Sequence, residues 1–177
     1  NTFLKNPLQR AVVPGVAGFY AELAALNEIP TAAPVLYLSA SPRQLHAGIS
    51  QFIFHNQLPR GVLITKRITS NATSEPLFDQ YAYKTAKLTQ ILELLPGVTF
   101  TLVGDDGERD PEIFDTIQRQ FPQRIAAIWI RRVNPDPQGE TSLFSLAATT
   151  TPKVAASTTS AATVIFARLT SCRRRRS

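Results

Sequence analysis

The stretch TLVGDDGERDPEIF, Thr101–Phe114, holds the pattern that decides the fold class. A short apolar run ends on Gly104, and Pro111 begins a segment whose apolar residues recur at helical spacing. This order predicts a strand, a glycine turn and a helix. The turn also carries three aspartates, a glutamate and an arginine, which is more carboxylate than a turn needs. These carboxylates repel one another unless a cation or a proton relieves them, so the turn is a candidate site.

The same alternation of strand and helix extends over the rest of the chain up to Val133. Apolar runs of strand length predict strands near 35–38, 62–65, 99–103 and 125–130, and helical spacing predicts helices between them. Ser41 is expected to cap one of these helices and Asp110 another, each with a proline at the first helical position. Strands that are apolar on both faces and alternate with helices predict an α/β fold with a mainly parallel sheet. Ligands of such sheets bind beyond the carboxyl ends of the strands.

The composition changes after Val133, which divides the chain into two parts. Residues 1–133 are expected to form one folded domain, whereas 134–177 are rich in Ala, Thr and Ser and end in an arginine tail. We expect this second part to be a mostly disordered extension, with little periodicity before the short run ATVIFARL.

Charge and cysteine content exclude several classes of protein. The net charge is +6, but only +2 remains without the four arginines Arg173–Arg176. The rest of the chain therefore lacks the excess of basic residues that is typical of a nucleic-acid-binding domain. The single cysteine, Cys172, excludes an internal disulfide and a cysteine-based zinc site. We expect a cytoplasmic protein that contacts membranes peripherally at most, and no nucleic-acid partner.

Four polar residues at predicted strand ends and helix starts form a candidate catalytic set: Ser39, Lys84, Asp105 and Asp110. A hydroxyl, an ammonium group and carboxylates are what phosphoryl transfer requires. The hydroxyl donates to a phosphate oxygen, the lysine neutralises charge, and the carboxylates hold Mg²⁺.

Each of these residues also has a simpler interpretation. Ser39 taken alone is a turn serine, Lys84 a surface lysine, and Asp110 the cap of the helix that Pro111 begins. Arg131 and Arg132 could bind an anion, although a solvated rim is the simpler reading. A receiver-type phosphoacceptor domain uses similar residues, but there the acidic pair comes first, whereas here the order is hydroxyl, lysine, acids.

That order is the order of motifs two to four in the haloacid dehalogenase superfamily of phosphatases. Residues 1–133 resemble, more narrowly, the catalytic domain of the actin-patch-associated phosphatidate phosphatases, which are related to the lipins. The resemblance rests on VPGVAGFYAEL (13–23), YLSASPRQL (37–45), LPRGVLITKR (58–67), YK (83–84), LVGDDGERDPEIF (102–114) and FPQRIAAIWIRRV (121–133). It implies a Rossmannoid three-layer sandwich and a Mg²⁺-dependent hydrolase that converts phosphatidate to diacylglycerol and phosphate. A small soluble phosphomonoester is the other substrate class.

The resemblance also implies a role for each site residue. Ser39 would be the hydroxyl that binds the phosphoryl group, and Lys84 the lysine of motif three. Asp105 would be a direct Mg²⁺ ligand, and Asp110 the second acid of motif four. Ser41 and Lys66 would be secondary residues of the substrate pocket, with Lys66 a reserve candidate for the motif-three lysine.

The chain departs from the family pattern at the nucleophile. In the family an Asp-x-Asp-x-Thr motif lies on the first, central strand, upstream of a segment like NTFLKNP, whereas here no aspartate precedes Asp79. We therefore expect the nucleophile and the central strand to be missing from this chain, and the chain alone to be inactive and poorly stable. The alternative function is a catalytically silent lipid-surface or interaction module, with the arginine tail supplying membrane attraction.

Overall fold

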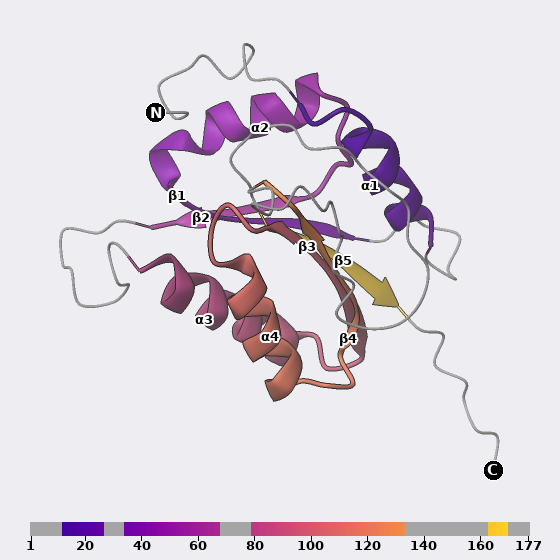
Figure 1. Cartoon of the computed structure of the whole chain (residues 1–177). Helices are drawn as coiled ribbons and strands as arrows, with labels where there is room; N and C mark the ends of the chain where they lie inside the picture. The colour runs from indigo at the N-terminus through magenta and orange to yellow at the C-terminus, as the bar shows by residue number, and fades with distance from the viewer. Residues whose placement is uncertain (1–11, 27–33, 68–78, 134–162, 170–177) are drawn as a thin grey trace, which may run out of the picture.

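The computed structural model describes residues 12–26, 34–67, 79–133 and 163–169. A five-stranded sheet lies between two layers of helices, with α1 and α2 on one face and α3 and α4 on the other (Figure 1). In chain order the elements are α1 (Val16–Ala25), β1 (Val35–Pro42), the 3₁₀ helix η3 (Arg43–Leu45), α2 (His46–His55), β2 (Val62–Lys66), α3 (Gln80–Leu94), β3 (Val98–Asp105), α4 (Asp110–Gln120), β4 (Ile125–Arg131) and β5 (Thr163–Leu169).

The sheet has the order β2-β1-β5-β3-β4 and is mixed. The four predicted strands are confirmed and form two parallel pairs, β1 with β2 and β3 with β4. β5 lies between the two pairs and is antiparallel to both of its neighbours. The α/β fold class is therefore confirmed, but the sheet is mixed rather than mainly parallel, because a strand that we did not expect occupies its centre.

β5 comes from the segment that we expected to be mostly disordered. Residues 163–169 differ from that expectation because they form a strand within the apolar run ATVIFARL. The rest of 134–177 lies outside the described residues. The division of the chain at Val133 stays a prediction.

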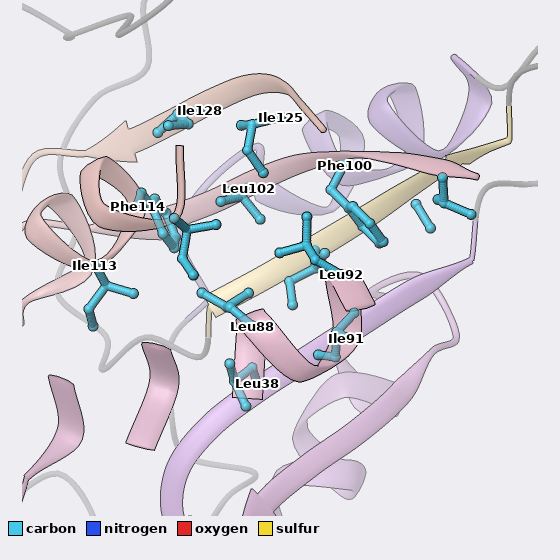
Figure 2. Close-up of a cluster of buried hydrophobic side chains, with 14 of the residues drawn as sticks. Leu38, Leu88, Ile91, Leu92, Phe100, Leu102, Ile113, Phe114, Ile125 and Ile128 are labelled. Atoms are coloured by element: carbon cyan, nitrogen blue, oxygen red, sulfur yellow. The ribbon is translucent and has the colours of Figure 1, made fainter. Parts of the chain in front are cut away.

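A hydrophobic core fills the space between the sheet and the α3–α4 layer (Figure 2). Leu38 of β1, Leu102 of β3 and Ile165 of β5 meet Leu88 and Leu92 of α3 there. A smaller core on the opposite face packs α1 against the sheet. In it the Phe19 ring lies 5.5 Å from that of Trp129, and the Tyr20 ring 5.6 Å from that of Phe166.

Arg124 joins the end of α3 to the start of β4. Its guanidinium donates to the carbonyl oxygens of Leu92 and Leu95 at the last turn of α3, and to that of Val98 at 2.7 Å. The last carbonyls of a helix have no partner within the helix, and a cation there also complements the helix dipole. This contact fixes α3, and therefore Lys84, relative to the sheet.

Candidate active site

The site lies at the edge of the sheet where the four parallel strands end. Ser39 and Ser41 lie near the end of β1, Lys66 ends β2, Asp105 ends β3 and Arg131 ends β4. β5 runs in the opposite direction, so its first residue, Thr163, reaches the same edge. The helices add Lys84 from the first turns of α3 and Asp110 from the first residue of α4.

Lys84 and Asp110 form a buried ion pair at the centre of this edge. Lys84 Nζ lies 2.6 Å from Asp110 Oδ1, and the side chains are 1% and 0% exposed. Glu108, which is partly exposed, places Oε2 3.1 Å from the same ammonium nitrogen. The pair joins α3 to α4 beneath the turn that carries the acidic residues.

Asp110 also holds the turn and β5 in place. Its Oδ2 accepts the backbone N–H of Asp105 at 3.4 Å, and its Oδ1 accepts the hydroxyl of Thr163 at 3.1 Å. Gly104 makes this approach possible, because a Cβ added there would collide with the Asp110 carboxylate. The glycine that ends the strand pattern is therefore required by the neighbouring aspartate.

Asp105 faces the β4 side of the site. Its Oδ2 accepts a hydrogen bond from the Arg131 guanidinium at 2.9 Å, and its Oδ1 accepts the N–H of Gly107 at 3.1 Å. Asp106 is tied to the end of β4 as well, because its amide donates to the carbonyl of Arg131. The acidic turn is thus held between α4 and the end of β4.

The electrostatic environment keeps Lys84 protonated. Burial by itself would lower its pKa, but the charges and hydrogen bonds of Asp110 and Glu108 outweigh burial and raise the pKa of Lys84 above 10.5. Burial raises the pKa of Asp110, opposed by the Lys84 ammonium and the Thr163 hydroxyl. Tyr20 of α1 shares this environment. Burial raises its pKa to about 12, with Arg131 opposing and Asp105 adding to the rise.

The structure separates the predicted site residues into two groups. Lys84, Asp105 and Asp110 are joined by the contacts above, whereas Ser39 lies beyond β5, on β1. Two strand spacings separate β1 from β3, about 9.6 Å. Ser39 Oγ accepts the amide of Ser41 at 3.2 Å, and Lys66 lies over the ring of Tyr83, with Nζ 5.3 Å from the ring centre.

Both predicted N-caps are wrong. β1 continues through Ser41 to Pro42, with an irregular register after Ser39, so Ser41 caps no helix. Asp110 is the first residue of α4 rather than its cap, because its carboxylate is bound to Lys84, Thr163 and the Asp105 amide. Tertiary contacts to a buried lysine here replace the local capping bond that the sequence favoured.

Sequence reasoning missed three contributors to the site. Glu108 was counted only as a member of the acidic turn, and Thr163 lay in the segment expected to be disordered. Arg131 was taken for a solvated rim, but its side chain is 20% exposed and bound to Asp105. The end of a strand next to an acidic turn was the available signal for Arg131.

Comparison with known proteins identifies the family. Residues 1–132 match the family described as "Phosphatidate phosphatase APP1, catalytic domain". The chain belongs to this family. Over 131 residues it is 33% identical to phosphatidate phosphatase APP1 of Saccharomyces cerevisiae, covering 74% of this chain and 21% of that protein. It is 30% identical over 135 residues to an uncharacterized protein of Schizosaccharomyces pombe, covering 76% of this chain and 22% of that protein.

The APP1 catalytic-domain match contains all six predicted site residues, whereas Thr163 and the rest of β5 lie outside it. The chain spans about a fifth of the length of these two relatives. No solved structure matches the chain.

The residues described by the structure offer Mg²⁺ a limited set of ligands. Within the described ranges no three His, Cys, Asp or Glu side chains gather as a metal-binding group. Mg²⁺, however, is often bound by one or two carboxylates and several waters, so Asp105 alone fits as one ligand. No helix in the described part of the chain has both the length and the apolar character needed to cross a bilayer.

Proposed function

We propose that this domain is the phosphoryl-binding part of a Mg²⁺-dependent phosphatase of the haloacid dehalogenase type that acts on phosphatidate. The family membership supports the reaction class. The observation that carries the proposal is the buried Lys84–Asp110 pair, which lies next to Asp105 at the carboxyl edge of the sheet. This is the combination of ammonium group and carboxylates that phosphoryl transfer requires.

In this proposal Lys84 neutralises negative charge on the phosphoryl group. Its raised pKa keeps the ammonium form at neutral pH, and Asp110 holds its position. A preorganised charge in a dry site stabilises a developing negative charge far better than one in water. Ser39 would donate its hydroxyl to a phosphoryl oxygen, with Ser41 and Lys66 lining the same pocket.

Asp105 is the proposed ligand of Mg²⁺. A bound Mg²⁺ would supply Lewis-acid stabilisation of the phosphoryl oxygens. Arg131 and Mg²⁺ would compete for the carboxylate, because Arg131 already binds Asp105 Oδ2. Arg131 would thus keep the charge of Asp105 compensated when no metal is bound, and would share the Asp105 carboxylate with a bound metal or give it up.

The covalent step requires a nucleophilic carboxylate. In the proposed mechanism it comes from the Asp-x-Asp-x-Thr motif that the family resemblance places on the central strand, upstream of residues like NTFLKNP. That strand would need a place beside β1 and β3, where β5 lies in this structure. Activity is therefore proposed for a protein that carries the motif, and residues 1–177 alone are expected to lack it.

The experiment joins the native upstream sequence to this chain and compares two substrate classes with Mg²⁺ and with EDTA. We expect Mg²⁺-dependent release of phosphate from dispersed phosphatidate, and a fall of at least about 100-fold for Asp105→Asn. Asp115→Asn is the matched control in the same region. Asp115 is 43% exposed and, among the described residues, pairs with Arg119 one turn along α4, so activity should be retained.

The outcomes separate the candidate functions. Hydrolysis confined to water-soluble phosphomonoesters would contradict the lipid substrate and leave the phosphatase class. Robust Mg²⁺-dependent turnover by residues 1–177 alone would show that the nucleophile has been misplaced.

The second candidate function is a catalytically silent interaction or lipid-surface module. The placement of β5 favours it, because β5 lies between Ser39 and the Lys84–Asp105–Asp110 group while Lys84 is almost fully buried. No hydrolysis of either substrate class by the chain with its upstream sequence, combined with binding to vesicles, would support this function.

A further inference from the structure

β5 fills the centre of the sheet although it comes from outside the family domain. The match to the family ends at residue 132, next to the end of β4 at one edge of the sheet. The chain re-enters the sheet at Thr163, two strands away from β4. The strand that completes the sheet therefore lies outside the residues that match the family.

The pairing of β5 uses both of its backbone edges. Against β1 the register runs from Val35 opposite Phe166 to Leu38 opposite Thr163. Against β3 it runs from Val98 opposite Leu169 to Val103 opposite Val164. Because β1 and β3 lie two strand spacings apart, about 9.6 Å, they cannot pair with each other, and the gap between them accepts a single strand.

Side chains of β5 are buried on both faces of the sheet. Val164 and Phe166 join the smaller core beneath α1, and Ile165 and Ala167 join the larger core beneath α3 and α4. All four are no more than 2% exposed. An occupant of the gap must therefore be extended, apolar on both faces and about seven residues long, the length of β5.

We propose that the groove between β1 and β3 is a strand-binding site, and that residues 163–169 occupy it as a separable ligand held by non-covalent contacts. Pairing along two edges and burial on two faces supply both affinity and register, as in other cases where a strand is added to a sheet. Thr163 gives the ligand a polar end that recognises Asp110, which fixes the direction of binding. The proposed phosphatase activity would need the same gap for the upstream Asp-x-Asp-x-Thr strand, so residues 163–169 and that strand would be alternative occupants of one site.

The test uses the full 177-residue chain with a specific protease site inserted between residues 134 and 162. After cleavage, size-exclusion chromatography and mass spectrometry report whether the C-terminal fragment stays with the body. We expect the fragment to co-elute in a 1:1 complex. Amide hydrogen exchange should still show protection at Ile165 and Ala167, which a free fragment would lack.

Two variants of the cleavable chain serve as controls. Ile165→Asp places a charge in the larger core, so its fragment should separate after cleavage. Thr163→Val keeps the shape and the pairing but loses the bond to Asp110, so its fragment should remain bound and dissociate faster.

An exchange experiment tests the ligand directly. A fluorescent peptide of residues 163–169 should replace the fragment in the cleaved complex, and excess unlabelled peptide should compete with it. Separation of the unsubstituted fragment at micromolar concentration, whether the body stays folded or not, would overturn the proposal. Elution of the uncut chain as a strand-swapped dimer would overturn the assignment of the groove to the chain's own segment.

Discussion

The two helix layers that cover the sheet differ in how deeply they are buried. In the layer of α3 and α4, α3 buries five residues and α4 buries four, including Lys84 and Asp110. In the layer of α1 and α2, α1 buries two residues and α2 buries none, and Phe54 of α2 is 75% exposed. Segments with few buried contacts open most easily, so the α3–α4 layer should be the more rigid one.

This difference matters for the candidate site. Lys84 and Asp110 belong to the more rigid layer, and the backbone N–H of Asp105 donates to Asp110. Ser39 and Lys66 lie at the ends of β1 and β2, where both are buried. The charged groups of the site are thus held by the more deeply buried of the two layers.

The largest expected effect comes from Lys84→Met. Removing the ammonium leaves Asp110 as a buried carboxylate without its cation, which should lower the free energy of unfolding by about 3–5 kcal/mol. The double variant Lys84→Met, Asp110→Leu should be more stable than the sum of the two single variants predicts, because it removes both charges. Additive effects in urea unfolding would show that the pair does not act as a unit.

The same pair gives the expected pH dependence. The pKa of Lys84 in the folded state is raised above 10.5, so its contribution is fully present below pH 10.5 and is lost as the pH rises through the folded-state pKa. The difference in unfolding free energy between the unsubstituted chain and Lys84→Met should therefore be constant from about pH 7 to about pH 9. It should shrink above pH 10.5. A difference that already shrinks near neutral pH would contradict the raised pKa.

Truncation of one apolar side chain in each helix layer compares their packing directly. Ile113→Ala removes a 0% exposed side chain of α4 and should cost about 2–5 kcal/mol. Phe54→Ala removes a larger but 75% exposed side chain of α2 and should change the stability by no more than about 0.5 kcal/mol. Equal costs in thermal or urea unfolding would mean that the two layers are packed alike.

The smallest effects are expected from two glycine substitutions. Gly104→Ala places a Cβ against the Asp110 carboxylate of α4 and should cost about 1–3 kcal/mol. Gly18→Ala, in α1, meets no atom within 4 Å and should stabilise the protein by roughly 0.5–1 kcal/mol. In the same unfolding assay the two substitutions should change the free energy of unfolding with opposite signs. If both were destabilising, the contact with Asp110 could not be taken as the cause of the cost at Gly104.

Local pattern was enough to predict most of the fold. β1 and β3 were found because they are largely buried on both faces and therefore appear as continuous apolar runs. β2 and β4, at the two edges of the sheet, are less buried but are apolar runs as well. Lys84, Asp105 and Asp110 were found because their side chains follow strand ends and helix starts. Residues at such places meet whenever the strands are parallel.

The errors arose where a distant contact replaced a local one. Asp110 gives up its capping role because a lysine 26 residues earlier in the chain takes its carboxylate. β5 has the apolar run of a buried strand, but nothing in that run indicates which strands it pairs with or in which direction. Thr163 joined the site only through this pairing, with Asp110 lying 53 residues away in sequence.

The position of β5 also has a consequence during synthesis on the ribosome. Among the described strands it is made last, yet the other four need it to become one sheet. A nascent chain that has emerged only as far as β4 therefore holds two strand pairs with open inner edges, and such edges invite pairing with other chains. To close the sheet, β5 must pair with strands made much earlier; Val35, for example, pairs with Phe166, more than 120 residues later in the sequence. Contacts between such distant segments form slowly, so closure should follow translation. Molecular chaperones that cover exposed strand edges should therefore matter most for this protein in the interval between synthesis of β4 and arrival of β5.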